Sequence, residues 1–245
     1  MKSIDDHREF LKGDLWGEWR LLDRDQEKGV PPPPRQKPYP EDAQLMDLAP
    51  FETLSLGTIP LADVIARRRS RRDYTEEPLT VEELSFLLWA TQGKCSENGT
   101  LRTAPSAGAR HPFETYLVVM RVTDLEQGIY RYLPLDHRLV LERADSDLEG
   151  PVTMGCLGQT FAGTAAVVFV WTAIPYRTEW RYSLISHKMI AIDAGHMCQN
   201  LYLAAESIGA GTCGIGAYDH KRMDELIGVD GHDEFTVYVA PVGKI

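Results

Sequence analysis

The stretch KMIAIDAGHMCQNLYLAAESI, residues 188–208, is the part of this 245-residue sequence that decides the fold. Apolar and small residues recur in it at alternating spacings of four and three, namely at Ile190, Ala194, Met197, Leu201, Ala204 and Ile208. This heptad-like period predicts a long helix with a seam suited to close packing. The seam is interpreted either as the hydrophobic spine of the domain or as half of a symmetric dimer interface.

A glycine-rich segment, GAGTCGIGAY at residues 209–218, follows this helix directly. Gly209 predicts the helix end, and Gly214 and Gly216 would leave main-chain N–H groups open to a ligand. The segment is not a dinucleotide-binding fingerprint, because it does not connect a strand to a following helix.

Upstream, Thr80 and Glu83 have the spacing of a capping box, which predicts a helix that ends at Gly93. Runs of β-branched and aromatic residues predict strands at 113–120, 128–133, 164–173 and 235–240. The mixture predicts an α+β fold in which helices surround a central mixed or antiparallel sheet.

Composition narrows the class of protein. The formal net charge is −10, and the four cysteines form no Cys-x-x-Cys pair, so neither a disulfide framework nor a metal site is expected. The charged first ten residues do not resemble a signal peptide, which makes a cytoplasmic location the default expectation. Residues 150–176 lack charge, but glycines interrupt them, so a buried strand is favoured over a membrane span.

The chain is divided into two parts by composition. Residues 1–53 are predicted to form a polar, Pro-rich arm, because four consecutive prolines at 31–34 favour an extended polyproline II conformation. Such an arm has no core of its own, so it is expected to lie over its own subunit or a partner, or to remain disordered. Residues 54–245 are predicted to form the compact domain.

Five arginines occur between residues 67 and 72, in the sequence RRRSRR, against the acidic balance of the chain. Guanidinium groups around a hydroxyl form a donor set suited to a phosphate, such as that of a phosphorylated cofactor. Nucleic-acid binding is not expected, because it calls for basic residues spread over a whole face. The alternative is a solvated, charged helix end.

Two further segments contain candidate binding residues. The segment TAPSAGARHP at 103–112 has small side chains that allow close backbone approach to a flat ligand, with Ser106 and Arg110 as polar groups. The segment PVGK at 241–244 places Lys244 where it could be a second cation for a phosphate. Each could also be an ordinary loop or a solvated terminus.

Together, in this order, these motifs resemble the FMN-dependent nitroreductase family over residues 54–245. Within that family, the amino-acid sequence at 104–112 and 211–218, with DAGH at 193–196, most resembles the branch of the SagB-type dehydrogenases. The resemblance implies the nitroreductase-like fold as an intertwined homodimer, with FMN between the subunits and NAD(P)H as co-substrate.

The same resemblance implies roles for particular residues. It assigns the FMN phosphate and ribityl chain to Arg68, Arg69, Ser70, Arg72 and Lys244. It assigns approach to the flavin, from the partner subunit, to Pro105, Ser106, Ala107 and Gly108. It assigns contact with the flavin ring, through main-chain hydrogen bonds, to Gly214, Ile215 and Gly216.

Substrate contacts are expected at Arg110, His111 and Arg181, and Tyr182 is the candidate proton donor. In azoline-oxidising members of the branch a Lys-Tyr pair occupies the positions of Arg181 and Tyr182. Arginine stays protonated and is a poor general base, so this pair departs from the azoline-oxidising pattern.

The sequence is compatible with three functions. The first is an FMN-dependent oxidoreductase that passes hydride from NAD(P)H to a small organic acceptor, such as a nitro or quinone compound, by a ping-pong mechanism. The second is a SagB-type tailoring dehydrogenase that oxidises a modified peptide or another small substrate. The third is a non-catalytic binding module that uses the arginine cluster.

Overall fold

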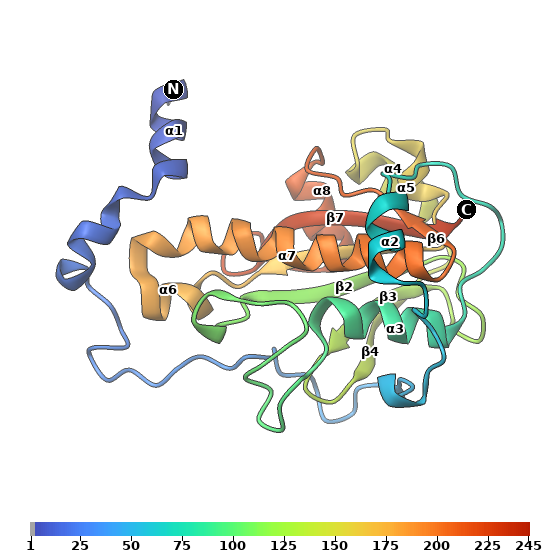
Figure 1. The fold of residues 1–245 in the computed structure, drawn as a ribbon, viewed down its shortest axis with the longest axis horizontal. Helices are drawn as coiled ribbons and strands as arrows, with labels where there is room; N and C mark the ends of the chain where they lie inside the picture. Colours follow the sequence, from blue (N-terminus) through green and yellow to red (C-terminus); the bar gives the residue numbers. More distant parts are fainter. Residues whose placement is uncertain (1–2) are drawn as a thin grey trace.

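Helix α7 (Ser186–Ser207) crosses one face of a seven-stranded sheet in the computed structural model, which describes residues 3–245 (Figure 1). Its seam residues from Ile190 to Ala204 are buried in a core that they share with the sheet and with α3 (Val81–Gln92). The seam is therefore the hydrophobic spine of the chain's own domain, which was the first of the two interpretations.

The sheet confirms the predicted α+β class. Its strand order is β1-β4-β3-β2-β5-β7-β6, and every neighbouring pair is antiparallel. The strands are β1 (Leu45–Asp47), β2 (Phe113–Val119), β3 (Gly128–Leu133), β4 (Arg138–Ala144), β5 (Val167–Ala173), β6 (Ala210–Thr212) and β7 (Phe235–Lys244). The four predicted strands correspond to β2, β3, β5 and β7. The sequence did not predict β1 and β6, which have three residues each, or β4, which ends in charged residues.

Alternation along the central strands builds two cores, because successive side chains point to opposite faces of a sheet. Leu117 and Val119 of β2 join the core under α3 and α7. Tyr116 and Val118 join a second core on the other face, which is covered by α4 (Glu149–Gly155) and α8 (His220–Ile227).

The remaining helices are α1 (Ile4–Lys12), α2 (Leu61–Arg67), α5 (Thr160–Gly163) and α6 (Tyr176–Tyr182), with 3-10 turns η1 (Asp14–Leu21), η2 (Phe51–Thr53), η3 (Ala107–Ala109) and η4 (Ser183–Ile185).

Helix α3 begins as the sequence predicts. The Thr80 hydroxyl accepts the Glu83 N–H at 3.2 Å, and the Glu83 carboxylate accepts the Thr80 N–H at 2.9 Å. These two bonds satisfy amides that would otherwise lack partners at the helix start. Gly93 caps the other end.

The uncharged segment at 150–176 contains α4, α5 and β5, and β5 lies fully buried between β2 and β7. This confirms a buried strand there. Within residues 3–245, no helix is both long enough and apolar enough to cross a membrane.

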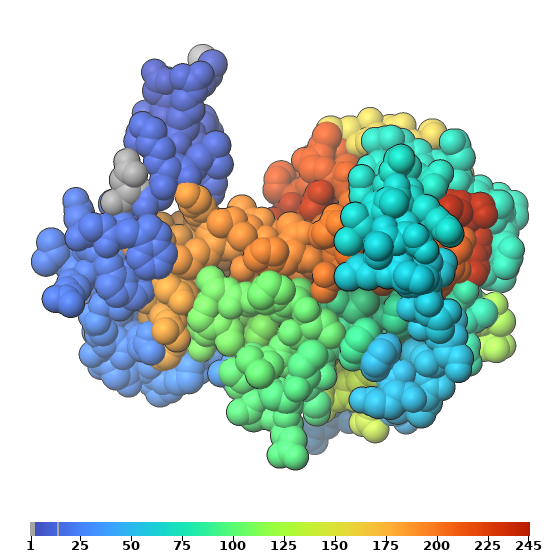
Figure 2. All heavy atoms as spheres, in the orientation of Figure 1, coloured from blue at the N-terminus to red at the C-terminus, as the bar shows by residue number. Residues whose placement is uncertain are grey.

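The described part of the N-terminal arm lies partly over its own subunit. Helix α1 buries none of its residues and projects from the body (Figure 2), whereas the extended stretch that follows it runs along the domain (Figure 1). Lys37 fixes this stretch, because its N–H donates to Glu114 at 2.8 Å and its carbonyl accepts from Arg131 at 2.9 Å. Its ammonium lies 2.5 Å from the carboxylate of Glu234.

Glu114 is the centre of a buried ionic network beneath the arm. Its side chain is 1% exposed and pairs with Arg177 at 2.5 Å and with Arg131 at 3.5 Å. The position at the start of β2 therefore serves structure, because a buried carboxylate is tolerated only when cations and N–H donors surround it.

We expect Glu114→Gln to lower the free energy of unfolding by about 3–5 kcal/mol, because it leaves the buried Arg177 guanidinium without its counter-charge. Glu142→Gln is the matched control, since Glu142 also pairs with Arg131 but its side chain is 32% exposed. This variant should lower the free energy of unfolding by about 1 kcal/mol. Urea denaturation measures both. Equal losses would contradict the central place of Glu114.

Candidate functional site

The arginine cluster lies beside the glycine-rich segment in space. Helix α2 ends at Arg67, and the chain then runs along β6: Ser70 bridges Thr212, and the Arg71 N–H donates to the Thr212 carbonyl at 3.0 Å. Gly211 allows this approach, because a Cβ there would lie 2.6 Å from the Arg71 side chain. The cluster is thus held by the edge of the sheet rather than by α2 alone.

Tyr202 of α7 joins the two segments, and the sequence analysis missed it. Its hydroxyl lies 3.1 Å from the Ser70 hydroxyl and accepts the Gly214 N–H at 2.7 Å. The Arg68 guanidinium lies 5.3 Å from the centre of its ring. The available signal was a tyrosine next to the apolar seam, about two turns before the glycine-rich segment.

The positive charge of this cluster is largely uncompensated. Arg71 approaches Glu206 at 3.8 Å, but no carboxylate among the described side chains forms an ion pair with Arg68, Arg69 or Arg72. Such a set suits a phosphate, because each guanidinium offers several donors in a planar array.

The guanidinium groups in the cluster differ in what they contact. Arg69 donates to the carbonyls of Ala66 and Arg68 at 3.0 and 2.8 Å, so it serves the end of α2. The Arg72 guanidinium lies 5.7 Å from the ring of Phe161 and is exposed. Arg68, Ser70 and Arg72 are therefore the members best placed for an external anion, and Arg69 fits the alternative of a charged helix end.

Lys244 is engaged elsewhere. Its ammonium pairs with the carboxylate of Glu83, the residue that also caps α3, and its side chain is 14% exposed. Its carbonyl accepts the Thr75 N–H at 2.9 Å, which keeps the end of β7 next to the chain that follows the arginines. The structure thus brings the end of β7 close in space to the chain that follows the arginines, but the charge of Lys244 is directed to Glu83.

The glycine-rich segment uses most of its amides internally. The Gly214 N–H is bound by Tyr202, and the Ile215 N–H donates to the Val239 carbonyl at 2.7 Å. Gly214 also packs tightly, because a Cβ there would lie 2.5 Å from the Tyr238 hydroxyl. Around Gly216, in contrast, a Cβ would meet nothing within 4 Å. Gly216 is therefore the member of this trio with open space for a ligand.

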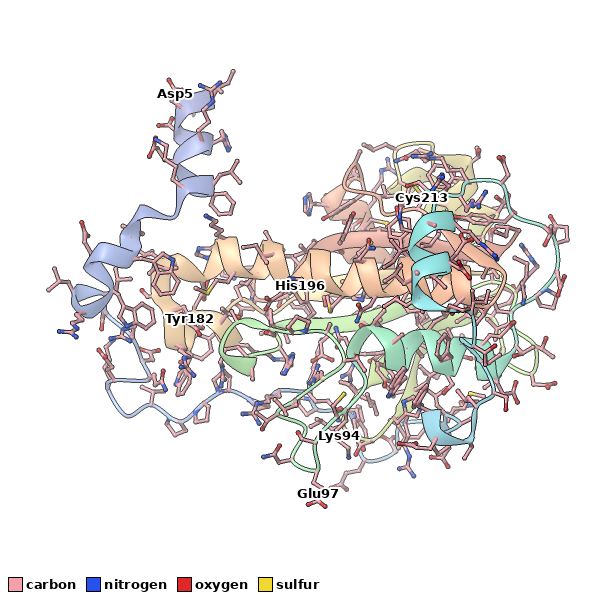
Figure 3. All side chains as sticks on the ribbon, in the orientation of Figure 1. Asp5, Lys94, Glu97, Tyr182, His196 and Cys213 are labelled. Carbon is pink, nitrogen blue, oxygen red and sulfur yellow. The ribbon has the colours of Figure 1, made fainter. Side chains whose placement is uncertain are left out.

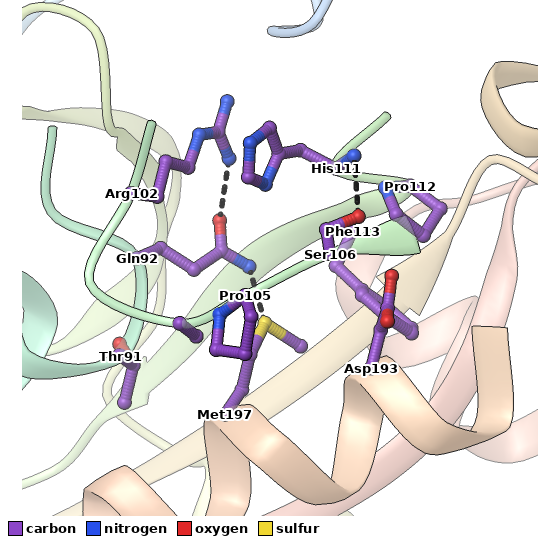
Figure 4. Close-up of a pocket in the computed structure, with 11 residues that line it drawn as sticks. Thr91, Gln92, Arg102, Pro105, Ser106, His111, Pro112, Phe113, Asp193 and Met197 are labelled. Atoms are coloured by element: carbon purple, nitrogen blue, oxygen red, sulfur yellow. Dashed lines mark hydrogen bonds between the residues drawn. The ribbon is translucent and has the colours of Figure 1, made fainter. Parts of the chain in front are cut away.

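The second group of candidates gathers at the other end of α7. Asp193 is buried, and its carboxylate accepts the Ala107 N–H at 3.1 Å, while the Ser106 hydroxyl accepts the His111 N–H at 2.9 Å (Figure 4). These bonds hold a loop in which Gly108, Ala109 and His111 all have positive φ. Asp193 is a second functional candidate that the sequence analysis quoted only as part of a motif.

Gly108 brings the loop against the candidate catalytic residue. A Cβ on Gly108 would lie 2.5 Å from the Tyr182 hydroxyl and 3.1 Å from Cδ of Arg181. Its φ of 58° is also a conformation that side-chain-bearing residues rarely adopt. Tyr182 ends α6 at the corner that leads into α7 (Figure 3). The structure thus unites Gly108, Arg181 and Tyr182.

His111 is closed off from solvent. It is 7% exposed, and its Nε2 lies 2.9 Å from the Thr100 carbonyl. Burial, with Arg102 nearby, lowers the pKa of His111 to about 4. A cavity of about 10 Å³ lies beside it, between Pro105 and Met197, which is enough for about one water molecule (Figure 4). His111 therefore supports the loop as a neutral imidazole.

Within one chain the two groups stay apart. Asp193 holds the Pro105–Gly108 loop and Tyr202 holds the arginine cluster, and the two residues are nine positions apart on α7. At 1.5 Å rise per residue this is about 14 Å along the helix. The sequence motifs therefore form two half-sites rather than one.

The chain is similar to known proteins over most of its length. The family model described as "Nitroreductase family" matches residues 65–244. A Methanocaldococcus jannaschii protein named as a nitroreductase is 36% identical over 198 residues, which cover 81% of this chain and 98% of that protein. The trifolitoxin-processing protein TfxB of Rhizobium leguminosarum bv. trifolii is 32% identical over 112 residues, which cover 44% of this chain and 30% of that protein.

Solved structures share the fold. A Ralstonia eutropha JMP134 structure named as a nitroreductase matches with a TM-score of 0.69 at 28% identity, over 87% of this chain and 98% of that chain. The NADPH:FMN oxidoreductase of Vibrio harveyi, complexed with NAD⁺, matches with a TM-score of 0.53 at 19% identity, over 75% of this chain and 68% of that chain.

We expect Tyr202→Phe to loosen the contact between the arginine cluster and the glycine-rich segment, because the hydroxyl bonds both Ser70 and Gly214. The free energy of unfolding should fall by about 1 kcal/mol, and the Gly214 amide should exchange its hydrogen faster. Tyr176→Phe is the control, since that hydroxyl bonds Asp25 on the arm. Unchanged exchange at Gly214 would contradict the role given to Tyr202.

The lowered pKa of His111 predicts a pH dependence. Between pH 6.5 and 4 the unfolded chain binds a proton at His111 that the folded chain does not, so stability falls as the pH falls. This contributes up to about 1.4 kcal/mol per pH unit. His111→Asn should remove that slope in urea denaturation at pH 6.5, 5.5 and 4.5, whereas the exposed His232→Asn should keep it. Parallel pH profiles for all three proteins would refute the prediction.

Proposed function

This chain belongs to the nitroreductase family and is an oxidoreductase of that family; from that premise we propose that it is FMN-dependent and uses NAD(P)H to reduce a small organic acceptor. The observation that carries the proposal is the set of Arg68, Ser70 and Arg72, free of carboxylate partners and tied through Tyr202 to the glycine-rich segment.

The residues present fit FMN. The two guanidinium groups and the hydroxyl would hold the phosphate, and the Arg68 charge over the Tyr202 ring keeps one donor group in place. The open space at Gly216 allows a flat ring to approach the main chain. Arg69 and Lys244 would contribute to the surrounding positive field rather than as primary contacts, because each already has partners.

Bound FMN would supply the hydride chemistry, taking a hydride from NAD(P)H and giving one to the acceptor. The chain's own residues bind and orient the reactants. Main-chain atoms of Pro105–Gly108, held by Asp193, would present a close-fitting surface to the ring. The Tyr182 phenol would hold a proton for the acceptor beside Gly108.

The separation of the half-sites supports the proposal of a homodimer. One copy carries the arginine cluster about 14 Å along α7 from its own Pro105–Gly108 loop, so a second copy is proposed to bring its loop to the first copy's cluster. An apolar groove of about 470 Å³ between α2, α3 and α7 offers a surface for it, with Leu61 of its lining 63% exposed.

A second candidate is a SagB-type tailoring dehydrogenase that oxidises a modified peptide. The similarity to the trifolitoxin-processing protein TfxB favours it, although the match covers 44% of this chain. It would use the same FMN half-site, with Tyr182 as the proton-handling residue. An anaerobic absorption spectrum separates the two: NADH or NADPH bleaches the flavin of an NAD(P)H-dependent reductase, whereas a substrate-driven dehydrogenase stays oxidised until its substrate is added.

We expect Arg68→Gln and Arg72→Gln each to raise the FMN dissociation constant at least about tenfold, because each removes a charged donor to the phosphate. Arg143→Gln is the control, since that exposed guanidinium pairs with Asp145. Fluorescence titration of the apoprotein with FMN measures all three. Wild-type affinity in both cluster variants, or no FMN uptake by the wild type, would refute the proposal.

A further inference from the structure

A second arginine cluster, made of Arg35, Arg102, Arg110 and Arg181, surrounds the far end of the Pro105–His111 loop. Arg35 from the arm donates to the Thr100 hydroxyl at 3.1 Å, and Arg102 donates to the Arg35 carbonyl at 2.8 Å. Arg110 donates to the Arg177 carbonyl at 2.8 Å. Main-chain carbonyls and a hydroxyl thus position these side chains, and these acceptors carry no counter-charge.

Two of the four arginines in this second cluster are buried, and the other two, Arg35 and Arg181, are half-buried. Arg102 is 8% exposed and Arg110 is 4% exposed, yet none of the four members forms an ion pair with any carboxylate whose position the structure describes. The buried carboxylate of Glu114 is taken by Arg177 and Arg131.

Among the described residues, three nitrogens in the second cluster have no hydrogen-bond acceptor: Nε of Arg35, Nε of Arg102 and Nη2 of Arg110. Burial, and then the nearby Arg35 and Arg181, lower the pKa of Arg110. Buried charges are normally paired, because desolvation without a partner costs several kcal/mol. Glu114 already acts electrostatically on Arg102, so the donor that best matches an external anion is Nη2 of Arg110, with the half-buried Arg181 nearby.

Aromatic rings adjoin this charge. The ring of Tyr182 lies 5.4 Å from that of Trp19 and 6.3 Å from that of Trp16, and the Arg181 guanidinium lies 5.4 Å from the Tyr182 ring. Both tryptophans come from the N-terminal arm, and Trp16 is 50% exposed. The arm thus adds an aromatic wall, defined as Trp16, Trp19 and Tyr182, beside the second cluster.

The arm is held in place where it supplies this wall. The Trp180 indole N–H donates to the Val30 carbonyl at 2.8 Å, and the Gln26 N–H donates to the Trp180 carbonyl at 2.9 Å. The Arg110 guanidinium stacks 4.6 Å from the Trp180 ring, so the same residue contacts both the arm and the second cluster. The wall and the cluster therefore meet at one corner of the molecule.

We propose that this corner binds the acceptor, and that the acceptor is a small aromatic carboxylate. Its carboxylate would meet Arg110 and Arg181, and its ring would stack against Tyr182 and Trp19. The inference rests on the proposed function, because Gly108 joins Tyr182 to the loop that faces the flavin. It makes the N-terminal arm part of the substrate site.

Equilibrium dialysis with two probes, 4-nitrobenzoate and the neutral 4-nitrobenzyl alcohol, tests the inference without relying on turnover. The full-length protein should bind the carboxylate at least about tenfold more tightly than the alcohol. Arg181→Gln and Arg110→Gln should each reduce that preference to about twofold or less, whereas Trp19→Leu should weaken both probes. Arg143→Gln and Leu21→Ala, an exposed arm position, are the matched controls.

Arg181 is half-buried, and among the described residues its side chain has no hydrogen bond or ion pair, so its variant keeps the test valid if Arg110→Gln fails to fold. Equal affinity of the wild type for both probes would overturn the inference, as would a preference that survives Arg181→Gln. The flavin spectrum is measured on the same samples. A bleachable flavin without carboxylate preference overturns this inference alone, whereas carboxylate preference in a protein that takes up no FMN supports the anion site and overturns the proposed function.

Discussion

The packing of α7 on the sheet is the constraint on which the rest of the structure depends. The seam buries small and apolar residues against the sheet and α3, which fixes both the depth and the rotation of the helix. This packing directs the side chains next to the seam. Asp193 bonds the Pro105–Gly108 loop, and Tyr202 bonds Ser70 and Gly214. One helix therefore sets the geometry of both half-sites.

Arginine has two distinct uses in this acidic chain. Arg131 and Arg177 are buried against Glu114, where they anchor the arm and the start of β2. Around Arg68, in contrast, the described side chains supply only the approach of Glu206 to Arg71 at 3.8 Å, and around Arg110 they supply no carboxylate partner. Desolvation makes the buried, unpaired Arg110 expensive, whereas the exposed arginines around Arg68 present their donors to solvent, and each cluster is proposed to bind an external anion.

The arm connects these observations. Its prolines keep it extended, Lys37 binds it to Glu114 and Glu234, and its tryptophans then reach Tyr182. A segment that has no core of its own thus becomes ordered through the ions and rings of the domain. In the proposed enzyme the arm of one copy would lie at the acceptor end of the site, next to Tyr182, and the arginines of the other copy would hold the phosphate.

The sequence by itself determined the class of fold, the long helix, the capping box at Thr80 and the central strands, because these follow from local periodicity and capping chemistry. It also located the segments that contain the candidate site. Only the tertiary structure decided which side chains meet: that Lys244 pairs with Glu83, that Tyr202 bonds Ser70 and Gly214, and that Trp19 contacts Tyr182. Short edge strands and contacts between residues far apart in the chain leave no local pattern, so they become visible only when packing brings the segments together.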